Sequence, residues 1–188
     1  MNIRTLAIAT SLCLFANVGA TLAATPAPVQ GGANQKRAVE GCMNTWLFNG
    51  VWRMRVTGVE PIVVSGAPGF GVSVEVRNGT AKQLELGLTG VGGRGQGVAL
   101  IADDGDSLVL DDLDYQRLGY KDIVQGASAK RELMYHFAPG TTDAAARKPA
   151  KFLLQIDPAT NQVSGIHYAI ADPSFRVDLT CEGAKAAT

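Results

Sequence analysis

The chain has 188 residues, of which 17 are basic and 17 acidic, so its formal net charge at pH 7 is zero. Hydrophobic residues make up 46% of the composition, and a single domain of this length can bury a stable core without depending on additional disulfides or metal sites. The balanced charge leaves no electrostatic footprint for nucleic acid or for an anionic lipid surface, so neither is expected as a partner.

The N-terminus has the pattern of an export signal. Arg4 precedes an uncharged apolar run from Leu6 to Val18, and small residues follow as far as Ala24. We interpret residues 1–24 as a cleaved signal peptide, which places the protein in the periplasm or outside the cell, with no stable membrane insertion after cleavage. The alternative is a retained membrane anchor, but the apolar run is short for a span.

Three further parts follow the signal peptide. Residues 25–40, TPAPVQGGANQKRAVE, are rich in Pro, Gly and polar residues, and we expect a flexible linker there. Residues 41–182 are the predicted folded domain. Residues 183–188 are predicted to form a disordered tail.

The segment CMNTWLFNGVWRMRV at 42–56 contains both tryptophans and predicts a β-hairpin, because Asn49-Gly50 is a turn signal between alternating residues. A two-residue turn would pair Phe48 with Val51 and Trp46 with Arg53, and paired residues share a face of the sheet. One face, the predicted core face, then carries Leu47, Trp52, Met54 and Val56. The other carries Trp46, Phe48, Val51, Arg53 and Arg55.

The candidate binding residues are Trp46, Arg53 and Arg55, which this register places on the polar face. There Trp46 can stack on a guanidinium or stand exposed as an anchor for a partner. The alternative is that Trp46 packs under the linker or over a sheet edge, because large aromatic side chains are seldom fully exposed.

The rest of the domain alternates apolar and polar residues with a period of two, which predicts strands that each have one dry face. Turn signals such as Asn78-Gly79 and Asp172-Pro173 separate these runs. The spacing favours an all-β fold of about eight to nine strands in an antiparallel β-sandwich, and a closed barrel is the alternative. The segments that we expect to be strands are 70–78, 83–89, 130–137, 151–156, 164–170 and 174–181.

Two segments interrupt the alternation. Residues 111–126 predict a short helix or turn, and residues 138–150 predict a surface loop.

Cys42 and Cys181 are the two cysteines outside the signal segment. An even number of cysteines in an exported protein predicts one disulfide, and two free buried thiols are the alternative. The alternation puts Cys181 on a core face but Cys42 on the Trp46 face. The first strand therefore begins after Cys42, or the turn at Asn49-Gly50 is not a two-residue turn.

Metal and catalytic signals are weak. Met134 and His136 stand two residues apart on the polar face of one predicted strand and resemble half of a copper site. The aspartates of 103–114 supply calcium-type ligands, but Asp104-Gly105 is explained by a turn. We expect no cofactor and no enzymatic activity, because neither histidine of the chain lies in a motif that assigns catalytic roles. An unrecognised hydrolase with paired carboxylates stays open as an alternative.

The layout resembles the immunoglobulin-like domains of unknown function in secreted bacterial proteins, a group akin to the secreted mycobacterial immunogenic antigens. The residues that carry the resemblance are WRMRVTGVEP at 52–61, VSVEVRNGTAKQLEL at 72–86, ALIADDGDSL at 99–108 and KPAKFLLQI at 148–156. It covers residues 46 to 181 and implies an immunoglobulin-like sandwich and a secreted location. It implies no catalytic residues.

Together these patterns predict an exported, non-catalytic β-sandwich module that binds a protein or another component of the cell envelope. The alternatives are a periplasmic copper-binding or calcium-binding protein and the hydrolase.

Overall fold

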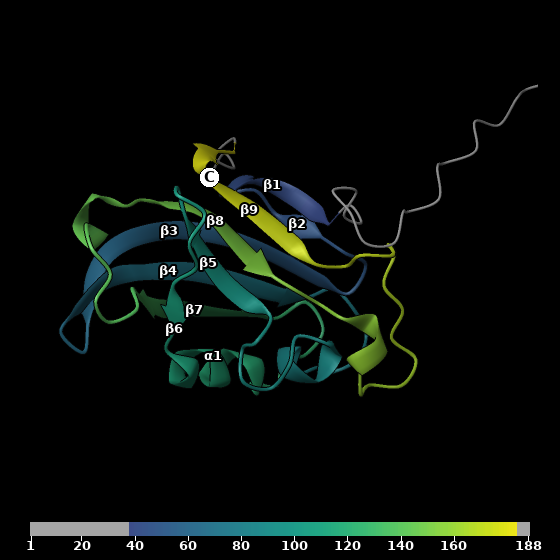
Figure 1. The fold of residues 1–188 in the computed structure, drawn as a ribbon. Helices are drawn as coiled ribbons and strands as arrows, with labels where there is room; N and C mark the ends of the chain where they lie inside the picture. The colour runs from purple at the N-terminus through teal and green to yellow at the C-terminus, as the bar shows by residue number, and fades with distance from the viewer. Residues whose placement is uncertain (1–37, 184–188) are drawn as a thin grey trace, which may run out of the picture. The chain divides into compact units, whose positions relative to one another are not determined.

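The structure, a computed structural model, describes residues 38–183, and its strands form two sheets (Figure 1). The predicted signal peptide and most of the predicted linker and tail lie outside these residues. The first sheet has the order β2-β3-β4-β7-β6, with bounds Leu47–Phe48, Trp52–Val64, Ala67–Asn78, Ser128–His136 and Val109–Leu110. The second has the order β1-β9-β8-β5, with bounds Val39–Met43, Phe175–Glu182, Pro149–Leu154 and Val98–Ala102.

The two sheets pack face to face and enclose one apolar core, so the predicted β-sandwich is confirmed and the closed barrel is wrong. The strands turn every second side chain inward, as the alternation predicts. In β3 the inward residues Trp52, Met54 and Val56 are all 0% exposed. From the opposite sheet, β8 and β9 contribute Phe152, Leu154, Phe175 and Val177.

One pair of strands departs from the predicted antiparallel arrangement. β1 runs parallel to β9, with Val39 opposite Phe175 and Cys42 opposite Asp178. Parallel pairing is possible here because β1 and β9 lie near opposite ends of the chain and need no tight turn between them.

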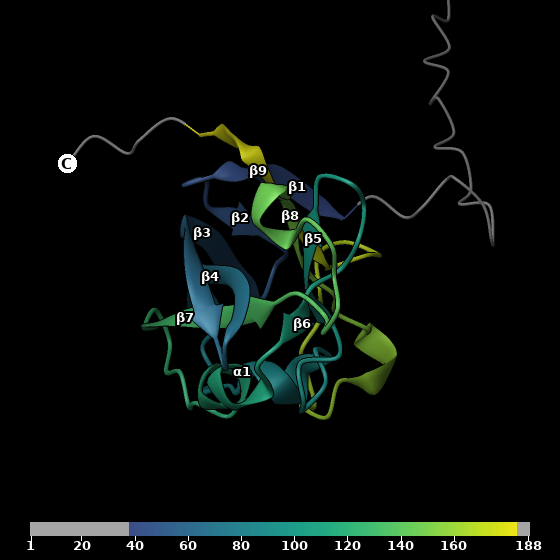
Figure 2. The same ribbon diagram turned by 60° about the vertical axis from the view of Figure 1, so that its left-hand side comes forward.

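A helical layer lies beside the sandwich. Helix α1 (Asp112–Gly119) turns Tyr115 and Leu118 into the core, and its first turn is capped by the Asp111 carboxylate, which accepts a hydrogen bond from the Leu113 N–H at 3.1 Å. Figure 2 shows this helix below β7 and β6. Three short 3₁₀ helices complete the structure: η1 (Leu86–Thr89), η2 (Ala144–Ala146) and η3 (Pro158–Thr160). No described helix is long and apolar enough to span a membrane.

Two of the predicted strands are not strands. Segment 83–89 forms an isolated bridge at Leu84 and then η1, and segment 164–170 is irregular. Leu84 and Leu86 are buried as predicted, but Leu84 lies in an isolated bridge to Ile123 and Leu86 in a 3₁₀ helix rather than both in one strand.

The hairpin of β2 and β3 has a different register from the predicted one. Phe48 pairs with Arg53 and Leu47 with Met54, and residues 49–51 connect the two strands. The reason is the buried Asn49 side chain, whose Oδ1 accepts hydrogen bonds from the N–H groups of Val51 and Trp52 at 3.0 and 2.8 Å. The register is displaced by two residues, and an even displacement keeps each strand residue on its predicted face. Val51 is the exception, because it lies in the turn and is buried.

Candidate functional site

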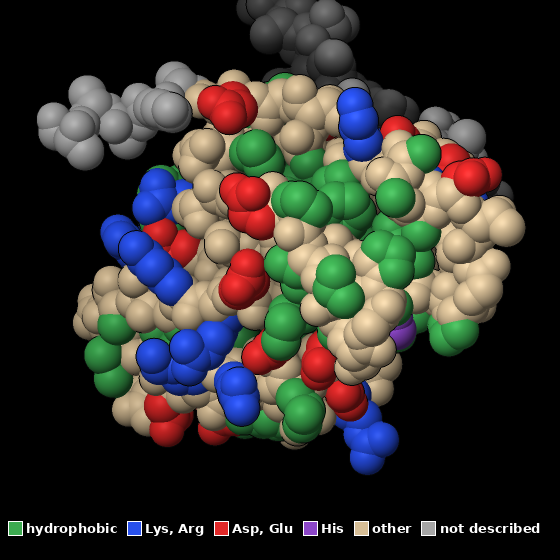
Figure 3. All heavy atoms as spheres, turned by 90° about the vertical axis from the view of Figure 1, so that its left-hand side faces the viewer, with side chains coloured by type: hydrophobic (Ala, Val, Ile, Leu, Met, Phe, Trp, Pro, Cys, Tyr) green, Lys and Arg blue, Asp and Glu red, His purple; other side chains and the backbone are tan. Residues whose placement is uncertain are grey.

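The candidate site lies on the outer face of the five-stranded sheet, over β2, β3 and β4. We call it the aromatic–arginine patch and define it as Trp46, Phe48, Arg53, Arg55 and Arg77. Because Trp52, Met54 and Val56 point into the core, the alternation along β3 turns Arg53 and Arg55 outward. Figure 3 shows Lys and Arg side chains gathered along its left-hand side, where Figure 2 places β3, β4 and β7.

The arginines of the patch stack on its two rings. The guanidinium carbon of Arg53 lies 4.4 Å from the centroid of the Phe48 ring. Those of Arg55 and Arg77 lie 4.5 and 5.0 Å from the Trp46 ring. Such cation–π contacts at exposed positions contribute about 0.5–1 kcal/mol each. Their effect is to hold three flexible side chains in defined positions.

A buried carboxylate lies beside the patch. Glu75 on β4 is 3% exposed, and its Oε2 accepts hydrogen bonds from Nε and Nη2 of Arg55 at 2.9 and 2.7 Å. The ammonium group of Lys130 on β7 lies 3.8 Å from the same oxygen. Burial raises the pKa of the Glu75 carboxyl, but the hydrogen bonds and charge of Arg55 and the charge of Lys130 outweigh it and hold the pKa below its ordinary value. Glu75 therefore balances the charge of Arg55.

The structure brings together all three residues that the sequence nominated as a binding site. Trp46 is half-buried under guanidinium groups, and Arg53 is exposed. Arg77 and Glu75 were missed as members of the site, although the alternation in 70–78 already put them on the polar side of their strand. Finding them required the pairing of β3 with β4, in which Arg53 faces Arg77 and Arg55 faces Glu75.

Met134 and His136 lie on the outer face of β7, opposite Gly71 and Gly69 of β4. Both are half-buried, and Nδ1 of His136 lies 2.9 Å from the carbonyl oxygen of Phe137. Among residues 38–183, no group of three or more His, Cys, Asp or Glu side chains is placed to hold a metal ion.

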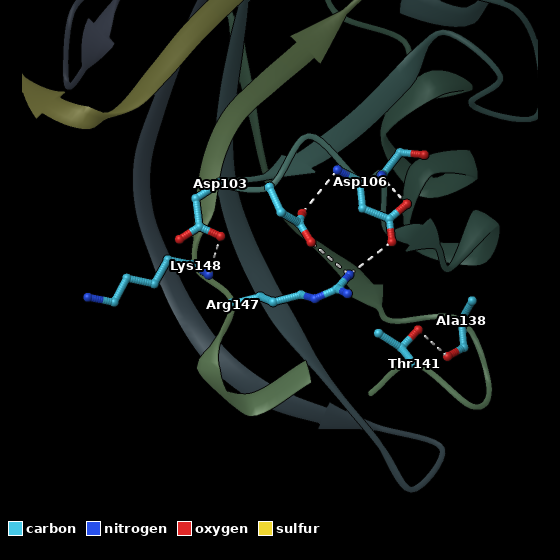
Figure 4. A network of polar contacts seen from close by, with 8 residues as sticks. Asp103, Asp106, Ala138, Thr141, Arg147 and Lys148 are labelled. Atoms are coloured by element: carbon cyan, nitrogen blue, oxygen red, sulfur yellow. Dashed lines mark hydrogen bonds and ion pairs between the residues drawn. The ribbon is translucent and has the colours of Figure 1, made fainter. Parts of the chain in front are cut away.

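The aspartates of the turn after β5 are held by an arginine from the predicted surface loop. Nη1 of Arg147 lies 3.0 Å from carboxylate oxygens of both Asp104 and Asp106, and Figure 4 shows its side chain reaching toward Asp106. Beside this pair, the Asp103 carboxylate accepts a hydrogen bond from the Lys148 N–H at 3.2 Å. These contacts fasten the loop that follows β7 to the turn, so the carboxylates have a structural role.

Cys42 of β1 and Cys181 of β9 form a disulfide, with their Cα atoms 5.1 Å apart. The predicted pairing is therefore present. The expectation that Cys181 points into the core is wrong, because Cys181 is only half-buried. The inward face of β9 is buried at Phe175 and Val177 and becomes partly exposed from Leu179 onward, where the strand no longer pairs with β8.

No protein-family model matches the sequence, and no curated protein matches it. Solved structures with a similar fold include the yjhA protein of Bacillus subtilis, with 15% identity and a TM-score of 0.47 over 73% of this chain and 98% of that one. MPT63, a secreted protein of Mycobacterium tuberculosis, matches with 9% identity and a TM-score of 0.46 over 76% and 98%. An uncharacterized β-sandwich protein of Clostridium difficile 630 matches with 10% identity and a TM-score of 0.42 over 79% and 99%.

Proposed function

We propose that this protein is an exported, non-catalytic binding module that engages a protein or another cell-envelope component through the aromatic–arginine patch. The observation that carries the proposal is the stacking of three guanidinium groups on two rings at 4.4 to 5.0 Å, with Arg53 and Arg77 still exposed. Tryptophan and arginine are among the residues that contribute most to binding energy at protein interfaces. Side chains that are already ordered also lose less entropy on binding.

Two features support export. The first is the apolar leader with its small-residue end, and the second is the Cys42–Cys181 disulfide, which is stable in an oxidising compartment. We also propose that the sandwich is a distant relative of the immunoglobulin-like domains of secreted bacterial proteins. The fold itself assigns no function, so the proposal rests on the residues of the patch.

The test is cosedimentation of the purified protein with an envelope fraction of the organism that produces it. The test variants are Trp46→Ala and Arg53→Gln. The matched control is Arg94→Gln, which removes one exposed positive charge from the loop before β5. We expect the bound fraction to fall severalfold in both test variants and to stay close to wild type in the control. Thermal melts of all four proteins separate lost binding from lost folding.

Equal binding by all four folded proteins would show that the patch is not the binding surface. A parallel fall in the test and control variants would show only a general dependence on charge, which also contradicts the proposal.

A further inference from the structure

The Arg53 and Arg77 side chains form a pair that the protein itself leaves uncompensated. They stand directly opposite each other on β3 and β4, and both are exposed on the outer face of the sheet. Like charges in directly opposed positions destabilise a sheet. Neither guanidinium forms an ion pair with an acidic side chain of residues 38–183. The buried carboxylate on the same face, Glu75, pairs with Arg55 and Lys130.

We propose that the Arg53–Arg77 pair binds a carboxylate supplied by an acidic segment of a protein partner. This inference rests on the proposed function and names the chemistry of the partner. The adjacent pair on the same two strands shows how this face accommodates a carboxylate. There, Arg55 is opposite Glu75 and donates two hydrogen bonds to one of its oxygens. A carboxylate from a partner would repeat that arrangement at the next pair on the same face of the sheet, two residues further along each strand.

The rings orient the arginines for this contact. A guanidinium that lies on an aromatic ring presents its flat face to the ring, while its N–H donors lie in the guanidinium plane and point away from the contact. The guanidinium carbon of Arg53 lies over the Phe48 ring, and that of Arg77 lies over the Trp46 ring. The in-plane donors match the two oxygens of a planar carboxylate. The rings thus act through the arginines, because at least one guanidinium group lies over each ring.

The surrounding charges favour an anion at this end of the sheet face. Arg55 and Glu75 neutralise each other, and the side chain of Lys130 is 72% exposed and adds a further positive charge. The nearest exposed acid on β7 is Glu132, which is opposite Ser73 and therefore lies on the side of Glu75 away from the arginine pair. A zero net charge for the whole chain thus coexists with a local excess of positive charge.

The test is a calorimetric titration of the purified protein with poly-L-glutamate at low salt. The test variant is the double substitution Arg53→Gln and Arg77→Gln. The matched control is the double substitution Arg94→Gln and Lys121→Gln, which also removes two positive charges, from exposed positions outside the patch. We expect the affinity to fall at least about tenfold in the test variant and about twofold or less in the control, as a close charged contact requires. Equal losses in the two variants, or no binding by the wild type, would overturn the proposal.

Sodium polyphosphate of similar length provides the second titration. If polyphosphate binds more tightly than poly-L-glutamate and its binding is lost in the same double variant, the occupant is a phosphorylated polymer and the proposal of an acidic protein segment is wrong. A failure of the carboxylate proposal can be distinguished from a failure of the proposed binding function. If envelope binding depends on Trp46 and Arg53 but the protein does not bind poly-L-glutamate, the proposed binding function stands and the proposal of a carboxylate ligand is wrong.

Discussion

Replacing Glu75 with Gln tests the electrostatic structure beneath the patch. The substitution keeps the size of the side chain but removes the charge that accepts two hydrogen bonds from Arg55. Hydrogen bonds to charged groups contribute about 1.5–3 kcal/mol, and breaking a fully buried ion pair costs about 3–5 kcal/mol. Since the Arg55 side chain is 25% exposed, water can solvate the released guanidinium. We therefore expect the free energy of unfolding to fall by about 1–2 kcal/mol at pH 7, because Gln still offers one carbonyl acceptor.

The pH dependence gives this prediction a sign. The folded protein holds the pKa of Glu75 below its ordinary value of 4.5. The stabilisation is therefore fully present above that ordinary value, and it is lost as the pH falls through the lower pKa of the folded state. The difference in unfolding free energy between wild type and Glu75→Gln should shrink toward zero on acidification over this range.

Urea denaturation of wild type, Glu75→Gln and the control Glu132→Gln, at pH 7 and at successively lower pH, measures the effect. Glu132 is an exposed acid on the same face, so its substitution makes the same change in charge. A loss of stability in Glu75→Gln that is independent of pH, or that equals the loss in the control at pH 7, would contradict this prediction.

Three further predictions concern the rest of the fold. Asn78→Ala removes a buried side chain that donates hydrogen bonds to the carbonyls of residues 82 and 123 and accepts hydrogen bonds from the backbone N–H and hydroxyl of residue 80. Denaturant unfolding should therefore show that the free energy of unfolding falls by about 2–4 kcal/mol. Replacing both Cys42 and Cys181 with Ser opens a loop with a sequence separation of 139, and the same assay should show that the free energy of unfolding falls by up to about 5 kcal/mol. An unchanged free energy of unfolding would contradict a stabilising role of the disulfide. Acrylamide should quench the fluorescence of Trp46 more strongly than that of Trp52, because Trp46 is half-buried and Trp52 is 0% exposed. The Trp52→Phe variant reports on Trp46 alone, and the Trp46→Phe variant reports on Trp52 alone.

The period-two pattern predicts much of this fold because burial on one face is a local property of a strand. It places the outward side of β3 and the apolar sides of β4, β7 and β8 correctly. It fails for 83–89, where Leu84 and Leu86 are buried by a bridge and a turn of 3₁₀ helix. Alternating leucines specify that two side chains are buried, and the surrounding structure decides which backbone conformation buries them.

The site shows the same division. Trp46, Arg53 and Arg55 could be grouped from the hairpin alone, because a displacement by two residues leaves the faces unchanged. Arg77 lies 22 or more positions away from them in the sequence, and only the β3–β4 register brings it opposite Arg53. The Asn49 side chain that sets the turn also escaped prediction, since its donor bonds to the carbonyl of Pro173, far along the chain.

The most direct test of the binding patch uses the indole N–H signals of the two tryptophans, followed by NMR as poly-L-glutamate is added. Trp46 lies under Arg55 and Arg77, whereas the indole N–H of Trp52 donates to the Thr89 hydroxyl at 2.9 Å inside the core. We predict that the Trp46 signal moves in a saturable way while that of Trp52 stays in place, and that Arg53→Gln with Arg77→Gln abolishes the shift. A stationary Trp46 signal, or an equal shift in that variant, would contradict it.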